Sequence, residues 1–322
     1  MARIVAIGTS QGGVQALRVL VGGLPEDFPA PVLIVQHIGA QSLLPVILND
    51  VGSLAAAFAL ESEPLIAGRI YVAPSDYHML VNDGRIELTR GPRENWARPA
   101  VDPLFRSAAL FYGPDAIGIV LSGRLNDGTA GLFEIKRFGG VAIVQTPHEA
   151  EAQDMPQSAL DNVAVDYSLP VAEMPRLLQR LAKETSQERI PFTRGVRAMN
   201  HQEQKLDQPT AQTCPECGGA MREESLANLT RFRCHIGHVM TAEVLAATQL
   251  DLLENNISTV LRSLNERVAL CRDLAAKHQD RGNLRAAEIW SRAAAEAEHR
   301  EKAAQDLVGA EWMHPEAAEA EA

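Results

Sequence analysis

The spacing of apolar residues in the first half of the chain predicts an α/β fold. Helical patterns lie between several short runs that are rich in β-branched residues, which predict buried strands. The strand-like runs cover 3–8, 31–38, 69–74, 116–123 and 140–145, and the helical patterns cover 13–24, 102–113 and 129–140. Apolar strands alternating with helices are typical of a parallel sheet covered on both faces, so we expect a doubly wound, mostly parallel sheet.

The segment 78–89 departs from this alternation. Its Asn82-Asp83-Gly84 sequence separates two short apolar runs, which is the signal of a β-hairpin. We expect this hairpin at one edge of the sheet, which would make the sheet mixed there. A last strand and helix over 163–182 end the α/β pattern, so the first domain is predicted to span residues 1–182.

The pattern changes several times beyond residue 182. Residues 183–213 are polar without sustained periodicity and predict a linker, and a cysteine-rich module follows over 214–240. Apolar residues then recur every three or four positions over 241–312, with a break at 280–283, which predicts a helical hairpin. The tail 313–322 is expected to be disordered. One face of the second helix is predicted to carry Ile289, Ala293, Ala297, Ala304 and Val308.

Composition narrows the class of protein. A net charge of −11 over 322 residues argues against nucleic-acid binding, which needs clustered Lys and Arg. No apolar run approaches the roughly 20 residues of a membrane span, and the chain enters a strand pattern at once. The four cysteines all lie beyond residue 213, unlike a secreted disulfide framework. We therefore expect a cytoplasmic protein with no direct membrane insertion.

A glycine-rich turn over 8–13 joins the first strand to the first helix and contains Ser10. Such a turn can cradle a phosphate, and its serine can cap the helix or act as a nucleophile on a sharp corner. A dinucleotide site would place Asp or Glu near the end of the second strand, but that strand ends in Gln36-His37. This difference disfavours nucleotide binding.

Reactive residues follow three of the predicted strands. Ser10, His37 and Asp127 each lie just beyond a strand end, where doubly wound sheets collect catalytic groups. Serine would attack, histidine would take its proton, and aspartate would orient the histidine. The backbone N–H of Gln11, at the start of the following helix, is a candidate oxyanion donor. Together these residues predict a serine hydrolase.

Five ordered motifs over about residues 3–182 resemble the catalytic domain of the chemotaxis protein-glutamate methylesterases, the CheB family. They are "AIGTSQGG", "IVQHI", "RPAVDPLF", "LSGRLNDGTAGL" and "VQTPHEAEAQDMPQSAL". The resemblance implies a Ser10, His37 and Asp127 triad that needs no cofactor. It also implies hydrolysis of γ-glutamyl methyl esters on chemoreceptors to glutamate and methanol, and in many members deamidation of particular receptor glutamines.

Two departures from the family pattern affect the oxyanion site. Gln11 replaces the usual threonine after the serine, and Arg124 and Leu125 replace Met and Gly in "GMGxDG", a loop whose Arg124 backbone is expected to help hold the oxyanion. Leucine does not readily adopt a positive φ, so we expect a loop of different shape. The alternative is therefore a weak or inactive CheB-like signalling protein that acts through its C-terminal modules. The resemblance includes no receiver domain, so any regulation is expected from the C-terminal half.

The cysteine-rich module has the spacing of a zinc knuckle. Cys214 and Cys217 form C-x2-C, and after sixteen residues Cys234 is followed by His235 and His238. Adjacent Cys234 and His235 would hardly bind one ion together, so His238 is the expected fourth ligand of a structural Zn²⁺. Similar segments with a helical hairpin follow some single-domain CheB-like proteins, which predicts a module for partner binding or homodimerisation.

Overall fold

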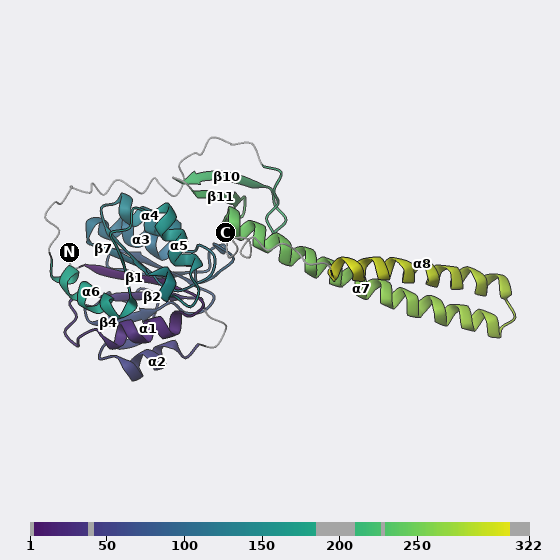
Figure 1. The fold of residues 1–322 in the computed structure, drawn as a ribbon, viewed down its shortest axis with the longest axis horizontal. Coiled ribbons are helices and arrows are strands. Elements are labelled where there is room, and N and C mark those ends of the chain that lie inside the picture. The colour runs from purple at the N-terminus through teal and green to yellow at the C-terminus, as the bar shows by residue number, and fades with distance from the viewer. Residues whose placement is uncertain (1–2, 38–41, 185–209, 227–228, 310–322) are drawn as a thin grey trace. The chain divides into compact units, whose positions relative to one another are not determined.

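A seven-stranded parallel sheet forms the centre of the N-terminal unit (Figure 1). The computed structural model describes residues 3–37, 42–184, 210–226 and 229–309. In sheet order the strands are β3 (Ala55–Phe58), β4 (Arg69–Val72), β2 (Val32–Gln36), β1 (Ile4–Thr9), β7 (Ala116–Val120), β8 (Val141–Gln145) and β9 (Tyr167–Leu169). The sequence did not predict β3, because its Ala-Ala-Ala-Phe run contains no β-branched residue.

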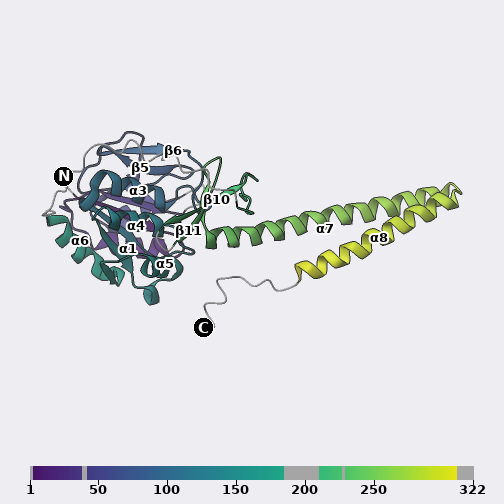
Figure 2. The same ribbon diagram turned by 90° about the horizontal axis from the view of Figure 1, so that it is seen from above.

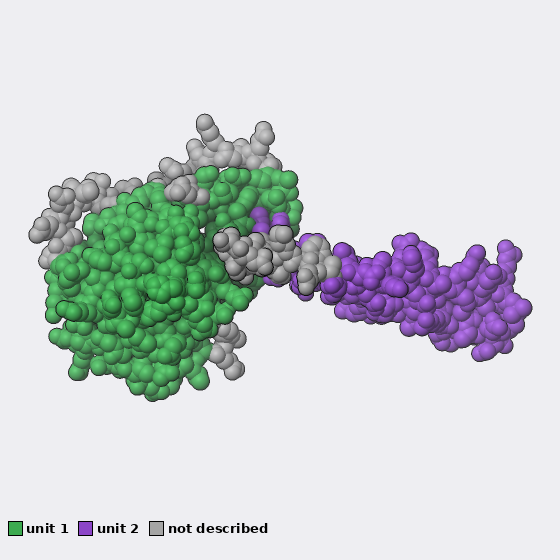
Figure 3. All heavy atoms as spheres, viewed as in Figure 1, with its two compact units in different colours: residues 1–244 green, residues 245–322 purple. Residues whose placement is uncertain are grey.

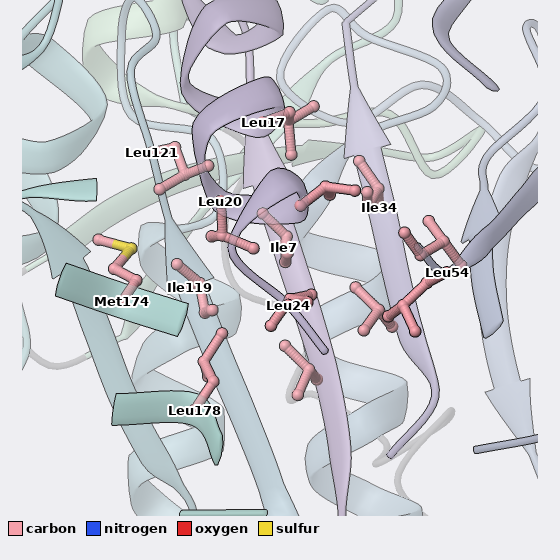
Figure 4. Packing of buried hydrophobic residues seen from close by; sticks show 14 of the residues in the cluster. Ile7, Leu17, Leu20, Leu24, Ile34, Leu54, Ile119, Leu121, Met174 and Leu178 are labelled. Atoms are coloured by element: carbon pink, nitrogen blue, oxygen red, sulfur yellow. The ribbon is translucent and has the colours of Figure 1, made fainter. Parts of the chain in front are cut away.

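Three helices cover each face of this sheet. On one face lie α1 (Gly13–Gly22), α2 (Leu44–Val51) and α6 (Met174–Lys183), and on the other α3 (Val101–Tyr112), α4 (Thr129–Arg137) and α5 (Asp154–Asn162). Figure 4 shows Leu17 and Leu20 of α1 and Leu178 of α6 packed over strand residues such as Ile7. This burial explains why the strands are apolar on both sides.

The predicted β-hairpin forms, but not at an edge of the main sheet. Strands β5 (His78–Asn82) and β6 (Arg85–Thr89) make a separate two-stranded sheet beside α3 (Figure 2). Met79, Val81 and Ile86 join the same buried cluster as Leu104 of α3. The expectation of a mixed sheet is therefore wrong, because the hairpin buries its apolar face on a helix instead of pairing with an edge strand.

The cysteine-rich segment folds as a small antiparallel sheet. Its strands are β10 (Met221–Leu226), β11 (Leu229–Cys234) and β12 (Val239–Thr241). Thr210 donates its N–H to the carbonyl of Met221, so the last residues of the predicted linker pair with this sheet. Residues 185–209 lie outside the described residues. Figure 3 shows one compact unit over residues 1–244, which includes this module, and a second over 245–322.

The two C-terminal helices, α7 (Ala242–Asp280) and α8 (Leu284–Val308), run side by side (Figures 1 and 2). The predicted break is a short turn after which the Asn283 side chain accepts the N–H of Ala286 as an N-cap, at 3.3 Å. The prediction for one face of α8 is confirmed at Ala297 but not at Ile289. Ala287, Ala294 and Ala297 are buried there, whereas Ile289 is 52% exposed.

Short 3-10 helices join some of the longer elements of the α/β domain. The 3-10 helices cover Gly113–Asp115, Pro147–Glu149 and Val171–Glu173. In the described part of the chain, no helix is both long enough and apolar enough to cross a bilayer. The predicted tail 313–322 lies outside the described residues.

Candidate active site

Ser10 follows β1 on a turn that leaves its hydroxyl free of a capping role. The N-cap of α1 is Gly12, and no side chain caps that helix. Gly12 has a φ of 75°, which glycine adopts without strain. A Cβ on Gly13 would overlap the side chains of Thr9 and Gln36, so the second glycine is needed for close packing. The helix-cap interpretation of Ser10 is therefore wrong.

Three hydrogen bonds hold this turn from within the α/β domain. The Ser10 N–H donates to the Ser122 carbonyl at 2.9 Å, and Gln36 Nε2 donates to the Ser10 carbonyl at 2.7 Å. Ser122 Oγ donates to the Gln11 carbonyl at 2.7 Å. Because Gln36 ends β2 and Ser122 follows β7, the two strands that flank β1 both fix the position of the serine.

His37 and Asp127 form a hydrogen-bonded pair next to this turn. His37 Nε2 lies 2.8 Å from Asp127 Oδ2, and the aspartate is only 2% exposed. The same oxygen accepts the N–H of Val101 at 2.6 Å, and Oδ1 accepts the side-chain amide of Asn95 at 2.9 Å. Burial alone would raise the pKa of Asp127, but the hydrogen bond and charge of His37 together with these donors bring it below its usual value. The carboxylate is thus kept ionised.

The strand register sets Ser10 beside His37. Thr9 of β1 pairs with Gln36 of β2, and the His37 N–H donates to the Thr9 carbonyl at 3.2 Å. Among the described residues no hydrogen bond joins the Ser10 hydroxyl to the ring, and none involves His37 Nδ1. Catalytic hydrogen bonds are often loose without substrate and tighten in the complex. The fold thus brings Ser10, His37 and Asp127 to one edge, with Nδ1 available as a base.

Backbone groups around Ser10 provide candidate oxyanion donors. The N–H groups of Gln11 and Gly12 have no acceptor among the described residues. A Cβ on Gly123 would lie 2.9 Å from that of Ser10, which places the loop containing Arg124 against the serine. An oxyanion in contact with Ser10 would therefore meet main chain from two loops.

Leu125 adopts the conformation that leucine was expected to avoid. Its φ is 60°, in the left-handed region, so the expectation based on its side chain is wrong. A left-handed leucine costs roughly 1–2 kcal/mol. The Leu125 N–H donates to Asp154 Oδ2 at 3.2 Å, which helps to hold the loop in this form.

Sequence reasoning missed the residues that surround Asp127. Asn95 donates from Nδ2 to Asp102 Oδ2 at 3.0 Å as well as to Asp127, so one amide bridges two buried carboxyl groups. Burial and the neighbouring charge of Asp127 raise the pKa of Asp102 to about 7. Asn95 lies in an aperiodic polar stretch, so only its hydrogen bonds in the folded protein identify it as a neighbour of Asp127.

A cleft of about 540 Å³ opens beside the serine turn. It lies between α1, α2 and the segment after β8. Its lining residues are Gly12, Val14, Gln15, Arg18, Ile47, Asp50, Val51 and Glu151. The lining carries charges of both signs as well as apolar side chains.

The four expected metal ligands also come together. One ligand atom from each of Cys214, Cys217, Cys234 and His238 lies within 4.8 Å of the others. His238 Nδ1 faces the thiols, at 3.4 Å from Cys234 Sγ, while its Nε2 lies 3.4 Å from a carboxylate oxygen of Glu216. A carboxylate behind a metal-binding imidazole is a common supporting contact in zinc sites. His235 is not part of this group and packs against Gly219.

Comparisons with known proteins agree with this geometry. The CheB methylesterase family model matches residues 5–178. A Leptospira interrogans protein assigned as protein-glutamate methylesterase/protein-glutamine glutaminase is 38% identical over 188 residues, which are 58% of this chain and 97% of that protein. Protein-glutamate methylesterase/protein-glutamine glutaminase 2 of Anaeromyxobacter dehalogenans is 40% identical over 56% of this chain and 53% of its own length. The crystal structure of the Thermotoga maritima CheB methylesterase catalytic domain has 33% identity and a TM-score of 0.54, over 56% of this chain and 99% of that one.

Proposed function

This chain belongs to the CheB methylesterase family, and on that premise we propose that it hydrolyses glutamate methyl esters on chemoreceptor-like proteins with Ser10 as nucleophile. The observation that carries the proposal is the bonded His37–Asp127 pair, which the strand register sets beside Ser10. Relatives with this domain are also named protein-glutamine glutaminases, so glutamine side chains are a second class of substrate.

In the first half of the reaction, Ser10 Oγ attacks the carbonyl carbon of the ester while His37 Nδ1 takes its proton. Asp127, bound to Nε2, stabilises the imidazolium that forms. The tetrahedral intermediate places its negative oxygen near the free N–H groups of Gln11 and Gly12. Collapse breaks the ester C–O bond, and the imidazolium gives its proton to the departing methanol.

The second half repeats these steps with water. His37 takes a proton from a water molecule, which attacks the acyl-serine, and Ser10 leaves with that proton to restore the enzyme. The products are methanol and a glutamate side chain. With a glutamine substrate the same sequence releases ammonia in place of methanol.

The cleft beside Ser10 supports a protein substrate. It begins at Gly12, two residues after the nucleophile, and extends along α1 to Arg18. A glutamyl side chain projecting from a receptor helix would reach Ser10 while neighbouring side chains of that helix contact this cleft. Arg18, Asp50 and Glu151 then offer charged partners for the polar face of the substrate.

The Cys/His cluster supports a structural Zn²⁺ held by Cys214, Cys217, Cys234 and His238. Three thiolates and one imidazole, with Glu216 behind the imidazole, fit the tetrahedral donor set that zinc prefers. When bound, the ion would cross-link the ends of the small sheet. All four positions would be filled by protein, which leaves no position on the ion for substrate.

The helical hairpin supports a role in homodimerisation. Leu253, Val260 and Leu270 of α7 are each about half exposed, at 46%, 50% and 59%. Leu253 and Val260 lie seven residues apart and so share one face of α7, where accessible apolar side chains can form a helix–helix interface. A concentration-dependent mass near twice 34.9 kDa in sedimentation would support this assignment, and a monomer at all concentrations would contradict it.

Methanol release from a methylated receptor fragment tests the function. We expect wild type to release methanol and Ser10→Ala to release at least about 10³-fold less, because the nucleophile is gone. Ser291→Ala, at an exposed serine of α8, serves as the matched control. Equal slow release by wild type and Ser10→Ala would contradict the proposal.

A further inference from the structure

The small C-terminal sheet contacts a loop that holds the catalytic aspartate. Val239 of β12 accepts the N–H of Asn95 on its carbonyl at 2.8 Å and donates its own N–H to the Arg93 carbonyl at 3.3 Å. Asn95 is 7% exposed, and its side chain reaches Asp127 Oδ1. Val239 directly follows the expected metal ligand His238. Two successive hydrogen bonds, both made by Asn95, therefore connect β12 to the carboxylate of Asp127.

A second set of contacts reaches the residue before Asp127. Thr241 Oγ1 donates to Asn126 Oδ1 at 2.8 Å, and Asn126 Nδ2 donates to Glu243 Oε2 at 2.8 Å. Thr241 is fully buried and Asn126 is 4% exposed. Both polar ends of the Asn126 side chain are thus satisfied by residues that follow the Cys/His cluster.

The backbone at both contact points is in a conformation that needs support. Asn95 and Trp96 have φ values of 49° and 63°, and Leu125, next to Asn126, has a φ of 60°. Left-handed residues other than glycine persist only where their surroundings hold them, and they concentrate at functional sites. Here part of that support comes from β12 and the start of α7. Without it, Asn95 would be free to move away from Asp127, and the loop that contains Asn126 and Asp127 would be free to shift.

We propose that the Cys/His module is a positioning element for catalysis, in which Val239 and Thr241 hold Asn95 and Asn126 so that Asp127 stays in line with His37. Metal binding at Cys214, Cys217, Cys234 and His238 then controls the activity at Ser10. The inference rests on the proposed function for its kinetic readout. It assigns the regulation of this site to the chain's own C-terminal module.

The first test uses full-length variants at Thr241, assayed for methanol release with metal bound. Thr241→Val removes the hydroxyl that donates to Asn126 Oδ1. We expect kcat/KM to fall about ten-fold or more, because a small displacement of a catalytic group lowers the rate strongly. Thr241→Ser restores the hydroxyl and should recover the rate to within about two-fold of wild type. Thr230→Val, on β11 and away from Asn126, is the matched control and should be neutral.

An independent test uses Glu243, which is exposed in the first turn of α7. Glu243→Ala removes the acceptor of Asn126 Nδ2, whereas Glu243→Gln keeps an acceptor oxygen. We expect the first to lower kcat/KM several-fold and the second to stay near wild type. A rate equal to wild type in both Thr241→Val and Glu243→Ala overturns the proposal.

The pH profile separates positioning from simple loss of structure. An imidazolium that loses its carboxylate partner gives up its proton more readily, so the acid limb of kcat/KM should move to lower pH in Thr241→Val. A lower rate with an unshifted profile would mean that less folded enzyme is present, and this result overturns the proposal.

Hydrogen exchange tests the metal dependence without any activity. Removing metal from full-length wild type with a chelator should raise amide exchange at least ten-fold in residues 93–97 and 124–127, while β1 and β2 stay protected. Unchanged exchange in both segments overturns the proposal. Wild type that shows this exchange response but releases no methanol would refute the proposed function alone, so the two failures are distinguishable.

Discussion

The two ends of the candidate triad are held by different parts of the chain. Gln36 and Ser122 hold Ser10, and both belong to the α/β sheet or its strand ends. Asp127 is also bonded within the α/β domain, through the N–H of Val101, but its neighbour Asn126 is bonded to Thr241, more than a hundred residues away. Ser10 is thus held by contacts within the α/β domain, whereas the loop that contains Asp127 is held by contacts from two separate segments of the chain.

This difference follows from where each residue lies. Ser10 directly follows a central strand, so the register of β1 with its neighbours fixes it. Asp127 lies seven residues beyond the end of β7, in a loop that the sheet alone does not position. Such a loop needs outside contacts, and a later module can supply them. The aspartate end is therefore the place where the C-terminal half can act on catalysis.

The largest effect should come from removing the charge at the aspartate end. Asp127→Asn is expected to lower kcat about 10⁴-fold, because the amide cannot stabilise the imidazolium or hold the ring in the right tautomer. Methanol release measures this loss, and Asp161→Asn, at an exposed aspartate of α5, is the control. A loss below ten-fold would show that the His37–Asp127 contact is structural only.

The buried carboxyl beside Asp127 should make stability depend on pH. The pKa of Asp102 is raised to about 7 in the folded protein, chiefly by burial, so the folded state binds a proton that the unfolded state has lost. The stabilisation is therefore present at low pH and lost as the pH rises through about 7. Asp102→Asn removes this titration.

Denaturant unfolding of both proteins between pH 5 and pH 8 measures the effect. The free energy of unfolding of wild type minus that of Asp102→Asn should fall by about 2–3 kcal/mol over this range, at 1.36 kcal/mol per pKa unit. A difference that stays constant with pH would mean that Asp102 does not titrate there.

A variant at the nucleophile end sharpens the comparison. Ser122→Ala removes the hydroxyl that donates to the Gln11 carbonyl and leaves the buried N–H of Ala152 without its acceptor. We expect about 1–3 kcal/mol less stability and a lower kcat/KM. Because the hydrogen bonds of Ser122 to described residues all lie within the α/β domain, the fractional loss should be the same with metal and after chelation. A fall in kcat/KM that disappears after chelation would contradict the proposal that Ser10 and Asp127 are held independently.

The smallest effect is expected in the loop between the two ends. Leu125→Gly relieves the left-handed strain but makes the unfolded chain more flexible, so stability should change by less than about 1 kcal/mol. Leu125→Ala, which keeps the strain, is the matched comparison. Destabilisation well above 1 kcal/mol by glycine alone would show that the leucine side chain contributes packing that outweighs its strain.

Local signals were enough to predict most strands, and they singled out residues that the fold brings together at the strand ends and in the Cys/His cluster. Ser10 and His37 follow apolar strand-like runs, and parallel strands bring their carboxyl ends to one edge. The C-x2-C spacing likewise restricts which cysteines can share an ion. The face of α8 was harder to predict, because small alanines and larger apolar residues recur at overlapping helical positions, and close helix packing selects the alanines.

By itself, the sequence determined the α/β class, the order of most strands and several helices, and the residue types at the strand ends, because these depend on short-range periodicity and chain order. Only the tertiary structure decided that the β5–β6 hairpin packs on α3, that Asn95 bridges Asp102 and Asp127, and that Thr241 reaches Asn126. Each of these contacts joins segments whose local patterns carry no information about one another. Leu125 shows the same limit, since its positive φ becomes tolerable only within a loop that other parts of the fold support.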